Sequence, residues 1–139
     1  MHGFIRASMR LTLIGFTAAL LSCAGTESRQ APLQPAPISD FRQVAGKWGG
    51  LLKTVPPSRQ DWVDLAIKEN GTYRFSSFRT IGELFGSGTS VITDGRLMAE
   101  GDKGRATFTL YESGVGRMLK VDATTKSGLR YSADLTPAK

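Results

Sequence analysis

Apolar and polar residues alternate along most of the chain after residue 47. In one such run, Val63, Leu65 and Ile67 alternate with polar or small residues. Glycine-containing turn sequences separate the runs at intervals of about 8–12 residues, a spacing typical of β-sandwiches and β-barrels. The pattern predicts eight strands, in the segments 47–53, 63–67, 72–75, 87–92, 97–100, 106–111, 119–123 and 129–135.

The turn sequence Glu-Asn-Gly at residues 69–71 indicates how two of these strands pair. A two-residue turn would place Ile67 opposite Arg74, which mixes an interior side chain with a solvent-facing one. A three-residue turn, with Gly71 in the left-handed conformation, places Ile67 opposite Tyr73. Because a shift of one residue moves every side chain to the other face of the sheet, the apolar pattern favours the three-residue turn.

Every connection between the expected strands is short, so strands adjacent in sequence should pair as an antiparallel up-and-down meander. Eight such strands most readily close into a barrel, which leaves no unpaired edge. We therefore predict an all-β fold: a small eight-stranded antiparallel meander barrel, preceded by one short helical turn. The alternation points Trp62 outward and predicts these interior side chains: Trp48, Leu65, Ile67, Tyr73, Phe75, Phe108, Leu119, Val121, Tyr131 and Leu135.

The N-terminal segment has the organisation of a secretory signal. Arg6 and Arg10 provide positive charge, and residues 11–21 form an apolar run. This run is too short to span a bilayer, which takes about 20 helical residues. A short apolar run after a basic start is typical of a cleaved signal peptide rather than of an anchor helix.

The sequence Leu-Leu-Ser-Cys at residues 20–23 resembles the lipobox of bacterial lipoproteins. The resemblance implies that residues 1–22 are removed and that Cys23 receives acyl chains such as palmitate. Several acyl chains, at about 0.8 kcal/mol per buried CH₂, hold a folded domain on a membrane. Ala24 stands where an aspartate usually retains lipoproteins at the inner membrane, so the outer membrane is favoured. The alternative is an ordinary signal peptide followed by an unmodified cysteine.

The segment after Cys23 has the composition of a linker. Residues 24–39 contain Pro32, Pro35 and Pro37 among small and polar residues. In an extended polyproline conformation, at about 3.1 Å per residue, this segment would reach ~50 Å. We therefore expect three regions: a signal peptide at 1–22, the lipidated cysteine with a Pro-rich linker at 23–39, and a β-barrel domain at 40–139.

The composition excludes several kinds of catalytic and metal site. The chain of 139 residues has one histidine, His2, and one cysteine, Cys23. Neither a zinc site of cysteines and histidines nor a Ser-His-Asp or Cys-His nucleophilic centre can be assembled from them. The carboxylates, Asp61 among them, are expected mainly on turns and outward-facing positions. We predict no enzyme activity, no catalytic residue, no metal and no cofactor.

The start of the expected domain resembles the first motif of the lipocalins. Asp40 and Gln43 have the spacing of a capping box around one helical turn, and Gly-Lys-Trp at residues 46–48 then opens the first strand. In that family the tryptophan of the G-x-W motif closes one end of the barrel beneath an arginine from near the last strand. The resemblance therefore implies a lipocalin-like barrel closed by Trp48. Arg130 lies closest to the expected place of the arginine, but the alternation points it outward.

A lipid-anchored barrel without catalytic residues is most readily a binding or interaction protein. We predict a non-catalytic interaction module in the periplasm, at the outer membrane, with an envelope protein or a cell-wall polymer as its partner. The alternative is lipocalin-like binding of a small apolar ligand, a lipid or acyl fragment, in an interior lined by Trp48, Tyr73, Phe75, Phe108 and Tyr131. An enzyme that uses carboxylates is a third, disfavoured interpretation. Although the chain has 18 Lys and Arg against 12 Asp and Glu, a lipid anchor in the envelope argues against nucleic acid as a partner.

Overall fold

The computed structural model describes residues 31–77 and 86–139. In these ranges the chain forms nine β-strands and one turn of 3-10 helix, η1 (Phe41–Gln43). The strands are β1 (Gln34–Ala36), β2 (Gly46–Val55), β3 (Gln60–Ile67), β4 (Thr72–Ser77), β5 (Ser87–Thr93), β6 (Arg96–Gly101), β7 (Gly104–Ser113), β8 (Gly116–Thr125) and β9 (Arg130–Pro137). Over the same ranges, no helix has the length and apolar character needed to cross a bilayer.

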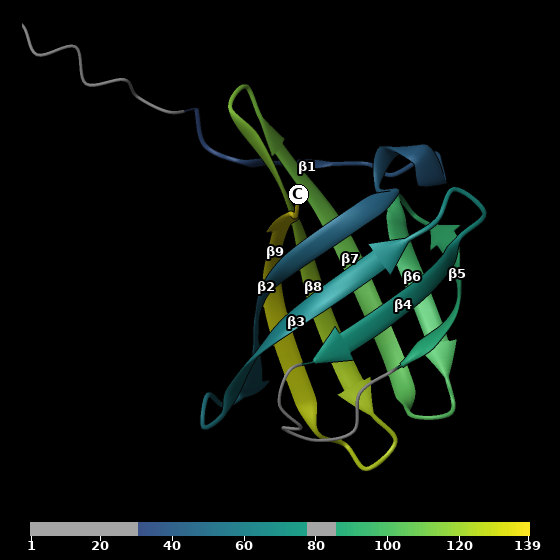
Figure 1. Ribbon diagram of the computed structural model, residues 1–139, viewed down its shortest axis with the longest axis vertical. Helices are drawn as coiled ribbons and strands as arrows, with labels where there is room; N and C mark the ends of the chain where they lie inside the picture. Colours follow the sequence, from purple (N-terminus) through teal and green to yellow (C-terminus); the bar gives the residue numbers. More distant parts are fainter. Residues whose placement is uncertain (1–30, 78–85) are drawn as a thin grey trace, which may run out of the picture.

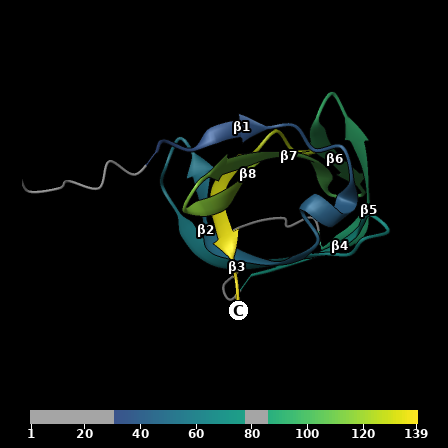
Figure 2. The same ribbon diagram turned by 90° about the horizontal axis from the view of Figure 1, so that it is seen from above.

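Strands β2 to β9 form a closed antiparallel barrel (Figure 1). Each strand pairs with the next one along the chain, and β9 pairs with β2 from Pro137 opposite Trp48 to Arg130 opposite Val55. Seen from above, the strands surround a common interior (Figure 2). The prediction of an all-β, eight-stranded up-and-down barrel is therefore confirmed.

Two hairpins show how the turn residues set the register of the sheet. Tyr73 pairs with Ile67, and Gly71 has a φ of 81°, so the predicted three-residue turn ending at Gly71 is confirmed. At the β5–β6 turn, Asp94 and Gly95 both have positive φ, 51° and 71°. This is the geometry of a tight type I′ hairpin, whose twist matches that of the flanking strands.

The barrel interior is filled from alternate positions on the strands. The side chains predicted to face it are all buried, none with more than 8% of its surface exposed. Trp62, predicted to face outward, is 47% exposed. Burial of these apolar side chains is the main favourable contribution to folding, at about 25 cal/mol per Å² of apolar surface.

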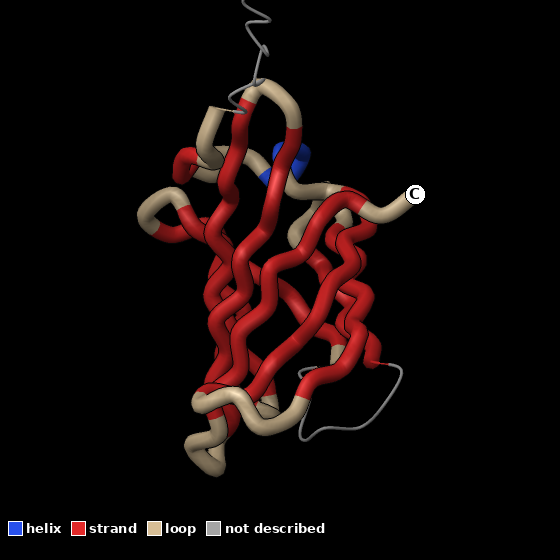
Figure 3. Tube along the Cα trace, turned by 90° about the vertical axis from the view of Figure 1, so that its left-hand side faces the viewer, coloured by secondary structure: helices blue, strands red, loops and turns tan. Residues whose placement is uncertain are grey.

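One end of the barrel, the capped end, is covered by η1 and the segment that leads into β2 (Figure 3). Asp40 accepts a hydrogen bond from the backbone N–H of Arg42 at 2.8 Å, and Gln43 accepts one from the backbone N–H of Asp40 at 2.9 Å. Together these bonds form the predicted capping box. The opposite end, the loop end, carries the β2–β3, β6–β7 and β8–β9 connections and lies at the bottom of Figure 1.

The β-structure begins before residue 40, within the segment 23–39 that the sequence assigned to the linker. β1 (Gln34–Ala36) pairs with residues 110–112 of β7, past the start of β6, where Leu97 pairs with Phe108. Ile38 is 1% exposed, and its backbone N–H donates to the carbonyl of Gly95 at 2.8 Å. Because β7 is longer than β6, it has a free edge near the capped end, and β1 occupies that edge.

Candidate functional site

Trp48 closes the capped end of the barrel. Its side chain is 2% exposed, and its indole N–H donates to the carbonyl of Val44 at 2.8 Å. The guanidinium of Arg117 lies 5.7 Å from the centre of the indole ring, within the range of a cation–π contact. The indole N–H is therefore already bonded, and Trp48 has no polar atom left to bind a ligand.

Arg117, at the start of β8, is the arginine that covers Trp48. It also donates to the carbonyl of Gln43 and forms an ion pair with Glu112, with Nε 3.0 Å from Oε1. These contacts join η1 to the β7–β8 hairpin. Arg130, the residue that sequence position suggested, is exposed and begins β9 at the loop end. Only the pairing of the strands shows that the β7–β8 turn, and not the start of β9, meets the capped end.

The other residues predicted to line a ligand site face the interior from three strands. Tyr73 and Phe75 come from β4, Phe108 from β7 and Tyr131 from β9, and all four are buried. The rings of Tyr73 and Phe108 have centroids 6.4 Å apart and are tilted by 55°. The structure thus brings Tyr73 and Phe108 together inside the barrel.

Two phenolic hydroxyls inside the barrel have no hydrogen-bond partner among the described residues. They belong to Tyr73 and Tyr131, which are 4% and 2% exposed. A Cβ atom on Gly88 would lie 3.1 Å from the Tyr73 hydroxyl, and one on Gly101 would lie 4.0 Å from it. A buried hydroxyl without a partner costs about 1–3 kcal/mol. Burial also raises the pKa of Tyr73, so this hydroxyl stays protonated and can donate as well as accept.

Asp61 also faces the interior, which corrects the expectation that it lies on a turn or an outward position. It is 4% exposed and accepts a hydrogen bond from the hydroxyl of Ser77. Asp61 lies near the start of β3 and Ser77 at the end of β4, so both are at the loop end. The alternation could have shown this, because Asp61 has the same parity as the inward-facing Val63 and Leu65.

Tyr131 also lines a groove of about 490 Å³ at the loop end. The groove lies between the β2–β3 connection and the β8–β9 turn, where Val55 and Leu129 are 39% and 52% exposed. Arg59 and Arg130 line it as well, and neither forms an ion pair with another described residue. Small-molecule sites have volumes of about 300–1,000 Å³, so this groove has the size of such a site.

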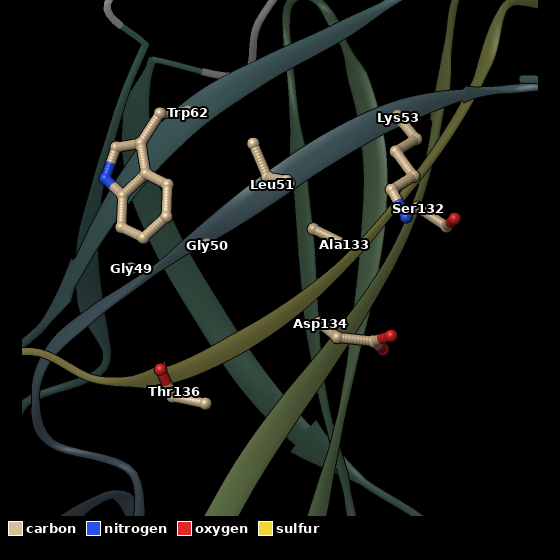
Figure 4. A pocket seen from close by; sticks show the side chains of 9 residues that line it. All are labelled: Gly49, Gly50, Leu51, Lys53, Trp62, Ser132, Ala133, Asp134 and Thr136. Carbon is tan, nitrogen blue, oxygen red and sulfur yellow. The ribbon is translucent and has the colours of Figure 1, made fainter.

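A second groove, of about 400 Å³, lies on the outer face where β2, β3 and β9 adjoin (Figure 4). Gly49 leaves a gap in the outward side chains of β2, and the indole of Trp62 extends over it. A Cβ atom on Gly49 would lie 3.1 Å from Cζ2 of that ring. The residues that line this outer groove are Gly49, Gly50, Leu51, Lys53, Trp62, Ser132, Ala133, Asp134 and Thr136. Sequence reasoning placed Trp62 outward but did not identify the groove, because its walls come from three strands.

No protein-family model, curated protein or solved structure matches the chain. The described residues contain no group of three or more His, Cys, Asp or Glu side chains that could hold a metal ion. Cys23 and the other residues that resemble a lipobox lie outside the described residues. Lipidation of Cys23 is therefore a prediction from sequence.

Proposed function

We propose that this protein is a lipid-anchored, non-catalytic binding module whose barrel interior takes a small amphipathic molecule. The observation that carries the proposal is the pair of buried hydroxyls, on Tyr73 and Tyr131, that find no partner within residues 31–77 and 86–139. Each unpartnered group costs about 1–3 kcal/mol. A bound molecule with its own polar atoms removes that cost, and we propose that it enters from the loop end, where Tyr131 helps to line a groove.

The surroundings of the two hydroxyls define the chemistry of the molecule. Phe75 and Phe108 offer apolar ring surface for a hydrocarbon or ring-shaped body. The Tyr73 and Tyr131 hydroxyls can each donate or accept, and Asp61 places a carboxylate near the loop end. We therefore expect a lipid or acyl fragment that carries hydroxyl or amide groups, rather than the wholly apolar ligand that the aromatic residues alone suggested.

The proposed lipid on Cys23 sets the orientation of the barrel. β1 pairs with β7 close to the β7–β8 turn, so the chain enters the barrel at the capped end (Figure 1). Residues 24–33, if extended at about 3.1 Å each, reach ~30 Å. We propose that the capped end faces the outer membrane and that the loop end faces the periplasm.

Replacement of Cys23 tests the anchor separately from the ligand site. Cys23→Ser should abolish metabolic labelling with fatty acid and release the protein from membranes, because the acyl chains supply the membrane affinity. A variant that remains labelled and membrane-bound would show that the lipoprotein assignment is wrong.

Native mass spectrometry of the lipidated chain, extracted in mild detergent, tests the interior site. We expect a retained molecule, seen as added mass, and its loss in Tyr73→Phe and Tyr131→Phe. Tyr111→Phe is the matched control, because Tyr111 lies on β7 outside the core and should not affect retention.

The stability of the ligand-free variants provides a second, independent measurement of whether the hydroxyls lack partners. Tyr73→Phe and Tyr131→Phe should be at least as stable as the parent chain, since each removes an unpartnered hydroxyl and keeps the ring. A loss of stability in both variants, with no retained mass in the parent, would mean that water satisfies the hydroxyls. The proposed interior site would then be abandoned.

The outer face supports a second role, the interaction with an envelope component that the sequence predicted. Leu51 and Trp62 pair across β2 and β3 and are 41% and 47% exposed. Adjoining exposed apolar groups in a groove are typical of interaction sites, whereas isolated ones are common on any surface. A partner bound only at this face would be unaffected by Tyr73→Phe, which separates the two roles.

A further inference from the structure

The outer groove combines one exposed aromatic ring with polar groups on a neighbouring strand. Leu51 pairs with Trp62 on one side and with Asp134 on the other, so these three outward positions form a row across β3, β2 and β9. In the next row, Gly49 adjoins Thr136. Figure 4 shows the indole at one side of the groove and the side chains of β9 at the other.

The indole of Trp62 is held in place before any ligand binds. Its N–H donates to Oδ1 of Asp64 at 3.3 Å. A Cβ atom on Gly49 would lie 3.1 Å from Cζ2 and 3.6 Å from Cε2, so the ring occupies space that only glycine leaves free. The residue is nevertheless 47% exposed. A pre-positioned ring with an accessible surface binds at a lower cost in conformational entropy than a mobile one.

The opposite side of the groove carries both donors and acceptors. Asp134 offers carboxylate oxygens, Ser132 and Thr136 offer hydroxyls, and Lys53 offers an ammonium group. The hydroxyls of a sugar also donate and accept, and a pyranose ring has a face made of C–H groups. A pyranose that stacks on the indole can therefore direct its hydroxyls to the side chains of β9 and Lys53.

Charge and polarity decide which class of ligand fits. Asp134 lines the groove with Lys53 and pairs across the sheet with Lys120. Asp64 shares a neighbouring hollow with Lys47 and Arg74. Charges of both signs are therefore interspersed around the groove, which suits a ligand with neutral donors and acceptors better than a polymer of one charge. A wholly apolar ligand would desolvate these charges without pairing them, which is unfavourable. We propose that the outer groove binds a neutral or N-acetylated pyranose unit of an envelope glycan, stacked on Trp62.

The two tryptophans of the chain allow a direct test by heteronuclear NMR. Chitotetraose and cellotetraose are the probes, representing an N-acetylated and a neutral glycan. We expect at least one of them to shift the indole N–H signal of Trp62 saturably. The signal of Trp48 should not move, because its N–H is buried and bonded to Val44.

Substitutions then locate the binding surface. Trp62→Ala should weaken binding at least about tenfold, the loss expected when a stacking contact is removed. Gly49→Ala should weaken it as well, because the new methyl group displaces the ring while every polar group of the groove remains. Leu129→Ala, at an exposed apolar residue of the loop end, is the matched control and should not change the affinity.

The site on the outer face does not depend on the interior ligand, so the two proposals can fail separately. Tyr73→Phe should leave the response of Trp62 to the sugars unchanged. The absence of a saturable shift with either sugar, or equal shifts of both indole signals, would overturn the glycan site. A response to the polyanion polygalacturonate as strong as that to the two tetrasaccharides would overturn it too, because binding would then not select a neutral or N-acetylated sugar.

Discussion

Replacing Trp48 with alanine removes the side chain that closes the capped end. Trp48 is 2% exposed, and its indole N–H is bonded to the carbonyl of Val44. Truncation of a buried tryptophan costs about 3–5 kcal/mol, because apolar contacts are lost and a cavity remains. The Val44 carbonyl also loses its donor, which adds about 1 kcal/mol. Since domains have about 5–15 kcal/mol of stability in total, we expect Trp48→Ala to be largely unfolded or close to its melting point at 37 °C.

Trp62→Ala is the matched control, with the same chemical change on the outer face. Trp62 is 47% exposed, so we expect a loss of about 1 kcal/mol. The assay is urea unfolding of residues 23–139 carrying Cys23→Ser, which removes the lipid and keeps β1. The m-value, by which the free energy of unfolding falls with urea, is about 1–3 kcal/mol per M. The urea midpoint should therefore fall by on the order of 2 M for Trp48→Ala and by less than ~1 M for Trp62→Ala.

Equal losses at the two tryptophans, or a larger loss at Trp62, would refute this reasoning. Either result would mean that the inward and outward faces of β2 and β3 are assigned the wrong way round. The capped end would then not depend on the indole of Trp48, and the resemblance to the first lipocalin motif would lose its structural basis.

Three further predictions concern the capped end and the segment that leads into it. Ile38→Ala should cost about 2–4 kcal/mol, because Ile38 is 1% exposed; an unchanged urea midpoint would show that this segment is not part of the fold. Arg117→Met should cost about 1–3 kcal/mol, whereas Arg130→Met should cost less than ~0.5 kcal/mol, and equal midpoints would contradict the contacts of Arg117. Hydrogen bonds from the side chain and backbone of Arg42 lower the pKa of Asp40 from 3.8 to about 2. The contribution of Asp40 to the stability of the fold is therefore complete above pH 3.8 and is lost as the pH falls towards 2. In Asp40→Asn the urea midpoint should change less with pH over that interval. A pH profile identical to that of the parent would argue against the capping role.

The architecture of the barrel was predictable because it depends on residues that are neighbours in sequence. Alternation sorts side chains to the two faces of a strand, and it correctly placed Trp62 outside and Tyr73 and Phe108 inside. The turn ending at Gly71 set the register of β3 against β4, because only one turn length keeps the apolar residues on one face. Short connections then left an up-and-down barrel as the simplest way to pair every edge.

The pairing of β1 (Gln34–Ala36) and the role of Arg117 were decided only by the tertiary structure. A three-residue strand is too short to show alternation, and the place of β1 exists only because β7 extends past the start of β6 at the capped end. Arg117 covers Trp48 because the β7–β8 turn reaches the capped end, which depends on how far each strand is displaced along its neighbours.

The candidate sites were also decided only by the tertiary structure. The alternation predicted that Tyr73 and Tyr131 face inward, but it could not show that their hydroxyls lack partners, because that depends on every group that surrounds them in the packed barrel. The outer groove likewise needs Gly49 of β2, Trp62 of β3 and Asp134 of β9 to lie side by side. Periodicity assigns a residue to a face of the sheet, whereas a binding site depends on which faces of different strands meet, and only the closure of the barrel determines that.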